Sequence, residues 1–359
     1  MEERKEIIRT HVAKGVKVDF AARLAGISKS TYYYKHKEGK PGRRPSTHTL
    51  NMQTNSLMPN EKVVQTIKNI IGSEFMENGY RKVAYELKDM GFCIGKTKTC
   101  RLMKAKGLML PRKRKGSRVY VRFTQPLPLM PFQHMEMDIK FIYIRGDRKS
   151  ALLITILDTF TRVALAWRLQ YSIKHTSVAD LFTSVIENWL LDFAPCFDDS
   201  ISVTLRSDND GRFNAIALKE FLCQNFINHE FILPATPQQN AHIESFHSIV
   251  EQLVCKKYEF SSIAEAKNTF ERFYQTYNYR RTISSILYLP PMTFLKECLK
   301  NNIGVQMRKE KGKIKQKFFF RGQRPIWHSA LPEDFFGVNK NNEYLIENGT
   351  FVLHTLNES

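Results

Sequence analysis

The feature that most constrains the fold is a change of hydrophobic periodicity near Gln133, where the pattern becomes strand-like. Apolar and polar residues then alternate, with Met135, Met137, Ile139, Phe141 and Tyr143 set against His134, Glu136, Asp138 and Lys140. A period of two predicts a β-strand with its apolar row towards a core. The segment Lys149 to Asp158 is apolar through its middle, as in a strand buried on both faces, and Thr161 to Leu169 alternates again. Three strands with short connections predict a meander.

Helices and strands alternate after this meander. We predict a helix over about 175–191, strand Ile201–Arg206, helix Asn214–Asn225, strand Glu230–Pro234 and a long helix from about Gln238. Three strands, helix, strand, helix, strand, helix is the element order of a ribonuclease-H-like α/β fold. We therefore place a catalytic core of this class at residues 126–260, followed by a helical extension over 261–299.

The long helix has a marked start and two distinct faces. Thr236 is a candidate N-cap, Pro237 stands at the first helical position, and Gln239 completes a capping box. Its apolar stripe predicts the buried face: Ile243, Phe246, Val250 and Leu253. The polar residues on another face are Asn240, Glu244, His247 and Glu251.

The first 36 residues read as a helix-turn-helix. Helices are predicted over Glu2–Ala13 and Val18–Leu24, with a third opening after Ile27. Gly26 permits the turn, and Ser28 is a candidate N-cap for the third helix. The side chains expected to face a major groove or phosphates are Lys29, Ser30, Thr31 and Tyr33. The alternative is an ordinary helical hairpin with tyrosines in its core.

A second helix-turn-helix is predicted over residues 61–118, after a linker over 37–60 that is rich in Pro, Gly, Ser, Thr and Asn. Its expected DNA contacts on the helices are Arg81, Lys82, Lys96, Lys98 and Arg101. A basic run adds Arg112, Lys113, Arg114 and Lys115, which could also be a solvated linker. Residues 300–359 are predicted to be a small basic β-rich module, because Asn348-Gly349 between apolar runs favours a hairpin.

The charge distribution supports nucleic acid as a partner. Residues 1–125 contain 28 Lys and Arg against 10 Asp and Glu, residues 126–259 contain 12 against 16, and residues 260–359 contain 15 against 9. Basic ends around an acidic middle favour double-stranded DNA, although a basic surface for solubility, RNA or an anionic membrane are alternatives. The most apolar stretch, Ala151 to Leu157, is too short to span a bilayer. The opening residues lack the apolar region of a signal peptide, so we expect a cytoplasmic protein.

The six cysteines are scattered without a C-x-x-C pair, which disfavours a zinc finger. A different metal is indicated by three acids: Asp138 within its strand, Asp208 just after a strand, and Glu244 on the long helix. Carboxylate oxygens suit Mg²⁺, and Mn²⁺ can substitute. Two such ions about 3.5–4 Å apart can support phosphoryl transfer without a covalent protein intermediate.

Four motifs resemble the integrase-core transposases of bacterial insertion sequences, relatives of retroviral integrases. They are His134-Met-Glu-Met-Asp-Ile-Lys140, Leu157-Asp-Thr-Phe-Thr-Arg162, Arg206-Ser-Asp-Asn-Asp-Gly-Arg-Phe213 and Pro237-Gln-Gln-Asn-Ala-His-Ile-Glu-Ser-Phe-His247. Thirty-five residues separate Asp208 from Glu244, as in the family's Asp-Asp-Glu triad. The resemblance implies that Asp138, Asp208 and Glu244 are catalytic and bind metal, that a 3′-hydroxyl is freed and then transferred, and that a homo-multimer joins two element ends.

Other residues are expected to serve the fold or the DNA. We expect Asp158 to cap a turn, Arg162 to anchor the fold, His247 to contact packing groups or phosphate, and Asn240 to brace the site or contact DNA. Departures from the family are the extra acid Asp210, which we expect to face water or cap the next helix, Ile283 in place of a usual His, and the missing zinc module. Rival readings are a nuclease or integrase with other substrates and a DNA-binding regulator without catalysis.

Overall fold

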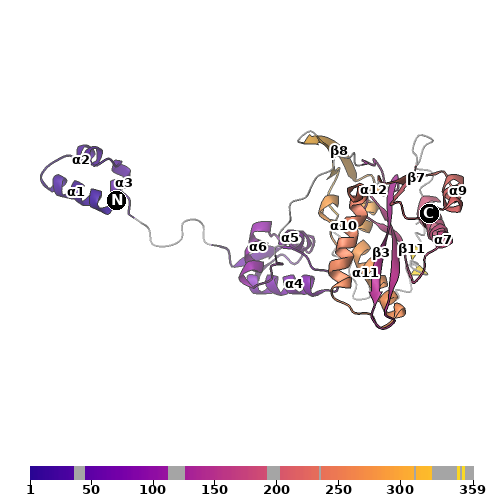
Figure 1. The fold of residues 1–359 in the computed structure, drawn as a ribbon. Coiled ribbons are helices and arrows are strands. Elements are labelled where there is room, and N and C mark those ends of the chain that lie inside the picture. Colours follow the sequence, from indigo (N-terminus) through magenta and orange to yellow (C-terminus); the bar gives the residue numbers. More distant parts are fainter. Residues whose placement is uncertain are drawn as a thin grey trace. The chain divides into compact units, whose positions relative to one another are not determined.

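The computed structural model describes residues 1–35, 45–111, 126–191, 203–233, 236–310, 313–325, 346–347 and 350–351. The chain forms two compact units, Met1–Ser46 and Thr47–Ser359 (Figure 1). Cys196 and the basic run Arg112, Lys113, Arg114 and Lys115 lie outside the described residues.

The first unit contains the three predicted helices, α1 (Glu2–Ala13), α2 (Val18–Leu24) and α3 (Lys29–Tyr33). Gly26 has a φ of +66° in the turn before α3, and the Ser28 hydroxyl caps α3 by accepting the Thr31 amide at 3.1 Å. A small core of Ile8, Ala21 and Ala22 holds the helices together. Of the three consecutive tyrosines, Tyr32 packs against this core while Tyr33 and Tyr34 are exposed.

The second unit opens with a helical module over residues 47–108. It begins with a hairpin of β1 (His48–Asn51) and β2 (Ser56–Pro59), followed by α4 (Asn60–Gly72), α5 (Tyr80–Asp89) and α6 (Lys96–Ala105). The prediction of a linker throughout 37–60 and of all-helical modules is therefore wrong for residues 48–59.

The hairpin has no apolar pattern in the sequence because the buried residues of its first strand are polar. The residues of β1 that face inwards are Thr49 and Asn51, so no apolar alternation marks the strand. The Asn51 side chain forms the turn instead, because its Oδ1 accepts the Gln53 and Thr54 amides at 2.9 and 3.3 Å. Its amide group also donates to the Met90 carbonyl at 3.3 Å, which ties the hairpin to α5.

A five-stranded mixed sheet forms the centre of the second unit. Its order is β5 (Ala164–Gln170), β4 (Lys149–Asp158), β3 (His134–Ile144), β6 (Val203–Ser207) and β7 (Ile227–Phe231). The first three strands pair antiparallel, whereas β6 and β7 run parallel to β3. This confirms the predicted ribonuclease-H-like α/β core, with the last strand beginning three residues earlier than expected.

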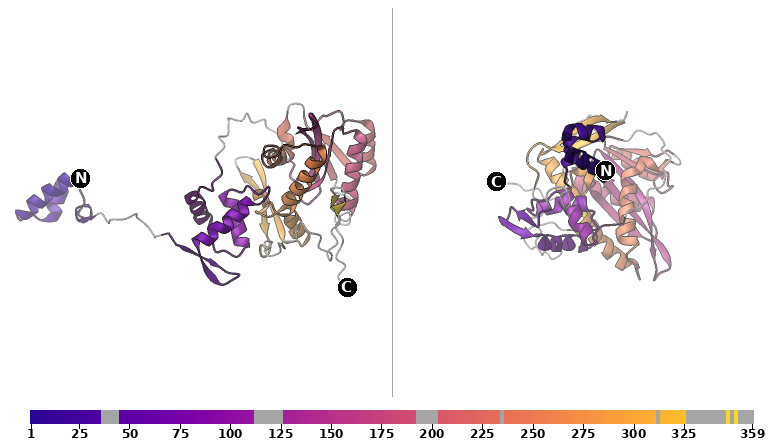
Figure 2. Two further views of the ribbon diagram at one scale, coloured as in Figure 1. Left: turned by 90° about the horizontal axis from the view of Figure 1, so that it is seen from below. Right: turned by 90° about the vertical axis from the view of Figure 1, so that its left-hand side faces the viewer.

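Helices cover both faces of this sheet (Figures 1 and 2). One face packs against α7 (His175–Val185), its π-helical continuation Ile186–Leu190 and α9 (Ile216–Gln224), with Met135 and Met137 in the core. The other face packs against α10 (Ala241–Val250) and α11 (Ile263–Tyr279), with Ile142 and Ile144 in the core.

The two cores divide β3 in a way that corrects its predicted apolar row. Phe141 and Tyr143 are 64% and 60% exposed, and Ile142 and Ile144 are buried instead. Pairing with β6 ends at Glu136, so the rest of β3 extends past the parallel part of the sheet. The period of two is correct, but the buried face changes along the strand.

The predicted long helix has an irregular start and end. A 3₁₀ turn (Pro237–Asn240) precedes α10, and a π-helical segment (Glu251–Cys255) follows it. The expected capping box does not form, because the Thr236 hydroxyl donates to the Leu233 carbonyl rather than capping the helix. The Gln239 side chain accepts the Leu233 amide at 2.7 Å and so stabilises the loop before the turn.

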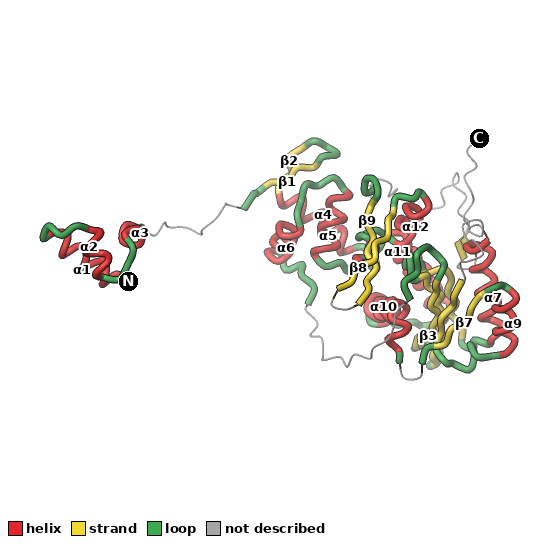
Figure 3. The backbone as a smooth tube through the Cα atoms, turned by 90° about the horizontal axis from the view of Figure 1, so that it is seen from above, coloured by secondary structure: helices red, strands yellow, loops and turns green. Residues whose placement is uncertain are grey.

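The C-terminal elements pack beside the core (Figure 3). A 3₁₀ turn (Ser284–Ile286) leads to α12 (Pro291–Leu299) and to the antiparallel pair β8 (Ile303–Glu310) and β9 (Lys313–Phe320). The strand pairing of the predicted hairpin is present, with β10 (Ile346–Glu347) paired to β11 (Thr350–Phe351). Its turn, Asn348-Gly349, and residues 326–345 and 352–359 of the predicted module lie outside the described residues. No helix within the described ranges is long and apolar enough to cross a membrane.

Candidate active site

Two of the predicted carboxylates belong to neighbouring parallel strands of the sheet, because Asp138 lies within β3 and Asp208 directly follows β6. The last paired residues of the two strands are Glu136 and Arg206, and each stands two residues before one of the acids. Asp208 is the first residue after β6, so the sheet fixes its backbone. Partial burial, together with the nearby charge of Asp138, raises the pKa of the Asp208 carboxyl. The two acids are therefore close enough to interact.

The Asp138 carboxylate contacts α10 through a histidine. His247 Nδ1 lies 3.3 Å from Asp138 Oδ2, and the backbone amide of Ile139 donates to Oδ1 at 2.7 Å. His247 Nε2 is buried without a hydrogen-bond partner. The sequence predicts a packing or phosphate contact for His247, whereas in the structure its ring contacts the carboxylate of Asp138.

Glu244 stands one helical turn before His247 and lines a groove of about 290 Å³. Both residues line this groove, together with Lys140, Ser248, Glu251, Gln252 and Lys256. Lys140 Nζ pairs with Glu251 Oε2 at 3.0 Å, which lowers the pKa of Glu251. The groove thus combines acids with two lysines beside the Asp138–His247 pair.

Within the parts of the chain that the structure describes, no group of three or more His, Cys, Asp and Glu side chains is arranged to hold a metal ion. Both oxygens of Asp138 already have partners, His247 and the Ile139 amide. The chemistry of the donors nevertheless fits Mg²⁺, since Asp138, Asp208 and Glu244 offer hard carboxylate oxygens.

The extra acid of the second motif has its own partner. Asp210 forms a bidentate ion pair with Arg212, with Nη2–Oδ2 at 2.5 Å and Nε–Oδ1 at 2.7 Å. Hydrogen bonding to Arg212 lowers the pKa of Asp210. The expectation that this side chain faces water or caps the next helix is therefore wrong, because the nearby guanidinium captures it.

Another acid at the site, Glu136, lies outside the set of predicted site residues. It is buried on the strand face that carries Asp138, and its Oε2 accepts the backbone amides of His242 and Ile243 at 3.0 and 2.8 Å. Burial raises the pKa of Glu136 to about 7. Glu136 thus connects β3 directly to the first turn of α10, two residues before Glu244. The available signal was a second acid two positions before Asp138, on the same face.

The neighbouring polar residues support the fold. Asp158 accepts the amides of Phe132 and Thr161 at 3.1 and 2.8 Å, as expected of a turn-capping residue. Arg162 is half-buried, lies near Glu136 and Tyr277, and has a φ of +68°. Asn240, immediately before α10, is buried, and its Oδ1 has no hydrogen-bond partner.

The predicted DNA contacts of the first unit lie on or near α3. Lys29 pairs with Asp19 at 3.1 Å, and the hydroxyls of Ser30 and Thr31 lie 2.8 and 2.7 Å from that of Ser28. Tyr33 is 58% exposed. Lys29 and Tyr33 thus remain at the surface of the unit, while the hydroxyls stabilise the helix start.

In the second module the predicted contacts divide into two groups. Arg81 and Lys96 are exposed. Lys98 donates to the His48 carbonyl at 2.5 Å, and Arg101 is half-buried. Lys82 lies against Arg281 and Glu86, and burial lowers its pKa to about 7. Lys82 and Lys98 therefore make contacts within the protein itself.

Comparisons with known proteins agree with this architecture. Residues 225–291 match the family model of the integrase core domain. The chain is 28% identical over 275 residues to an uncharacterized 39.2 kDa protein of insertion element IS476 from Xanthomonas euvesicatoria, covering 76% of this chain and 71% of that protein. It is 26% identical over 275 residues to an uncharacterized 31.7 kDa protein of insertion element IS407 from Burkholderia multivorans, covering 76% and 88%.

Two solved structures give weaker likenesses. The HTLV-2 integrase catalytic core in complex with magnesium has 15% identity and a TM-score of 0.34, covering 46% of this chain and 98% of that one. The catalytic domain of Mos1 mariner transposase has 12% identity and a TM-score of 0.35, covering 47% and 76%. The family model and the insertion-element relatives confirm the predicted resemblance to integrase-core proteins of insertion sequences.

Proposed function

We propose that this integrase-core protein is a DNA transposase in which Asp138, Asp208 and Glu244 bind Mg²⁺, or Mn²⁺, and catalyse cleavage and strand transfer. The observation that supports the proposal is the pairing of β3 with β6, whose last partners, Glu136 and Arg206, each stand two residues before one of the acids, together with the charge of Asp138 near Asp208. Two neighbouring carboxylates repel each other, so a purely structural role does not explain why both acids stand here. A shared cation offsets that repulsion.

The proposed reaction has two steps of the same kind. Water attacks a phosphodiester at the element end, the bond to the 3′ oxygen breaks, and that oxygen leaves as a 3′-hydroxyl. The freed hydroxyl then attacks a phosphodiester of target DNA, whose own 3′ oxygen leaves. Bound Mg²⁺ would supply activation of the attacking oxygen and stabilisation of the leaving oxygen.

The protein holds the three carboxylates in place and positions the DNA beside them. Asp138 is held within β3, Asp208 directly follows β6, and Glu244 stands on a helix that Glu136 ties to β3. Lys140 and Lys256 line the groove beside Glu244 and can contact phosphate oxygens. His247 contacts Asp138 and lines the same groove as Glu244.

Double-stranded DNA would be bound mainly through the basic ends of the chain. The candidate contacts are Lys29, Ser30, Thr31 and Tyr33 in the first unit, Arg81, Lys96 and Arg101 in the second module, the basic run 112–115, and Asn240 and His247 at the core. A homo-multimer would join two element ends, and the protein would act on DNA of the bacterial nucleoid.

The test uses full-length Asp138→Asn and Glu244→Gln with Glu251→Gln as a matched control from the same groove. The DNA substrates are the sequences that flank the gene. We expect both test variants to lose Mg²⁺-dependent cleavage and strand transfer and to keep DNA binding, while Glu251→Gln stays active. Substantial activity in either test variant would refute the assignment. Cleavage without strand transfer by the wild type would indicate a nuclease, and binding without cleavage a regulator.

A further inference from the structure

Arg324 follows β9 and connects three segments that are far apart in sequence. Its guanidinium forms a bidentate ion pair with Asp89 at the end of α5, with both N–O distances at 3.0 Å. It also donates to the carbonyls of Leu287 and Tyr288 at 2.6 and 3.0 Å. Asp89 is buried, with only 4% of its side chain exposed. The ion pair is therefore largely shielded from water, where a planar bidentate geometry is most effective.

Aromatic rings enclose the same guanidinium. Arg324 lies over the rings of Tyr85 and Phe320 at 5.2 and 5.8 Å. Tyr85 of α5 stacks on Tyr288 at 4.0 Å, and the ammonium of Lys96 lies over both tyrosine rings at 5.0 and 5.7 Å. These contacts join the middle of α5 and the start of α6 to the loop before α12.

Further contacts seat the helical module on the core. Arg281 donates to the Phe75 carbonyl at 2.9 Å, and Glu86 accepts from Asn78 at 2.6 Å and from Thr282 at 3.4 Å. Exposed ion pairs, Glu74–Arg272 at 3.2 Å and Glu77–Lys257 at 2.6 Å, surround this buried set. The module over residues 47–108 is therefore docked on the core through contacts from several segments of the chain.

We infer that Arg324 is a positioning residue that locks this module onto the integrase core and so fixes which phosphodiester is cut. The inference rests on the proposed function, because it assumes that α5 and α6 hold DNA while Asp138, Asp208 and Glu244 act on it. A rigidly docked module keeps bound DNA at a constant distance from these carboxylates. Loosening the lock lets neighbouring phosphodiesters reach the site.

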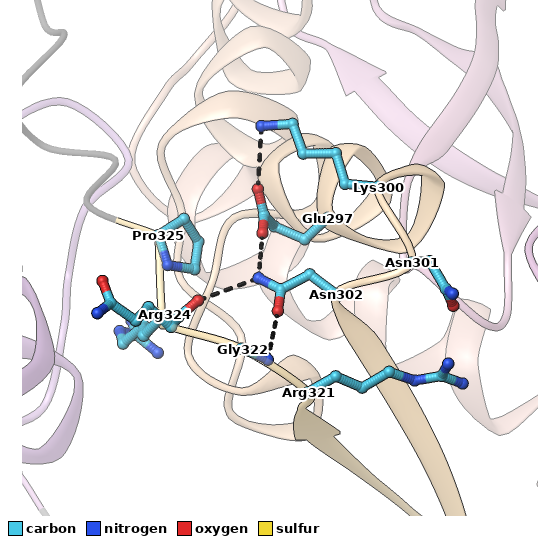
Figure 4. A pocket seen from close by; sticks show the side chains of 9 residues that line it. Glu297, Lys300, Asn301, Asn302, Arg321, Gly322, Arg324 and Pro325 are labelled. Atoms are coloured by element: carbon cyan, nitrogen blue, oxygen red, sulfur yellow. Dashed lines mark hydrogen bonds and ion pairs between the residues drawn. The ribbon is translucent and has the colours of Figure 1, made fainter.

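A neighbouring arginine provides a matched control. Figure 4 shows Arg321 and Arg324 on the wall of one cavity of about 810 Å³, with Glu297, Lys300 and Asn302. Glu297 and Asn302 hydrogen bond to each other at 2.5 Å, and Asn302 also accepts the Gly322 amide at 2.9 Å. Arg321 is exposed, and within the described residues its side chain forms no ion pair. Replacing Arg321 removes the same charge from the same wall without touching Asp89.

The experiment compares full-length wild type with Arg324→Ala, Arg324→Lys, Asp89→Asn and Arg321→Ala. Hydrogen exchange of α5 amides reports docking without any activity. We expect exchange to become about ten-fold faster in Arg324→Ala and Asp89→Asn, to be intermediate in Arg324→Lys because the bidentate geometry is lost, and to be unchanged in Arg321→Ala. Asp89→Asn keeps the size of the side chain and therefore serves if Arg324→Ala fails to fold.

The second measurement maps cut positions on end-labelled DNA at single-nucleotide resolution. Wild type and Arg321→Ala should cut one phosphodiester, whereas Arg324→Ala and Asp89→Asn should spread the cuts over its neighbours. Unchanged exchange would overturn the lock, and faster exchange with unchanged cut positions would overturn the positioning role. If wild type cuts no DNA, the proposed function fails and the positioning role fails with it, while the exchange data still decide whether Arg324 holds the module.

Discussion

Replacing Glu136 by alanine should loosen the start of α10, the helix that carries Glu244. The Glu136 carboxylate accepts two backbone amides of the first helical turn, at 3.0 and 2.8 Å. Helix starts leave such amides without partners inside the helix, so a side chain or water must satisfy them. Ile243 is fully buried, so its amide is shielded from bulk water.

The expected magnitude follows from these two amides. A buried donor left unsatisfied costs about 1–3 kcal/mol, and the half-buried His242 amide should cost less because water can reach it. Together they give about 2–4 kcal/mol for opening of the first turn. Since 1.4 kcal/mol corresponds to a factor of ten, amide exchange in α10 should become about 30-fold to several hundred-fold faster.

Hydrogen exchange measured by mass spectrometry on peptides from residues 241–250 tests this expectation. Glu136→Gln keeps the shape and one acceptor oxygen, so it should cost less than about 1 kcal/mol. Glu251→Ala, which removes a half-exposed acid near the end of the same helix, is the control and should cost about 0–1 kcal/mol. Equal exchange in wild type and Glu136→Ala would refute the reasoning. A Glu136→Gln variant as loose as Glu136→Ala would show that charge, rather than an acceptor, holds the helix.

Two further predictions concern the second motif and acid stability. Asp208→Ala should abolish DNA cleavage, whereas Asp210→Ala only frees Arg212 and should cost about 1 kcal/mol; the reverse pattern of activity would show that the triad is misassigned. Burial, with Arg206 nearby, lowers the pKa of His134 from 6.5 to about 4. The unfolded chain therefore binds this proton first, and stability should fall by up to about 3 kcal/mol between pH 6.5 and 4. Unfolding free energies measured by denaturation across this range should depend less on pH in His134→Gln than in the wild type. An equal pH dependence in the two proteins would contradict the assignment.

The arrangement of the central sheet could be predicted because its strands carry strong patterns. The middle of β4 is apolar as the sheet buries both of its faces, and the order of helices and strands after it follows from changes of period. Phe141 and Tyr143 show the limit of this reasoning. A period of two identifies the faces of a strand, but which face is covered depends on where β6 and the helices end.

The site residues also differ in whether the sequence alone could identify them. Asp138, Asp208 and Glu244 stand at predictable places, within a strand, after a strand and on a marked helix. The contacts of Glu136 and His247 depend on how α10 is placed against β3, over a separation of more than 100 residues. Local patterns contain no information about that placement, so these two roles emerged only from the structure.

The hairpin of β1 and β2 changes how the chain should be cut for biochemical dissection. A boundary chosen from composition would fall near residue 60 and would discard both strands. That cut would remove the Asn51 side chain from the Met90 carbonyl and the His48 carbonyl from Lys98, and it would leave Phe92 without its bridge to Asn51. A fragment beginning at Thr47 keeps these contacts. We therefore expect fragments that start near residue 47 to be recovered folded, and those that start near 61 to be less stable, because they also lose the packing of Met58 against the apolar cluster of α4, α5 and α6.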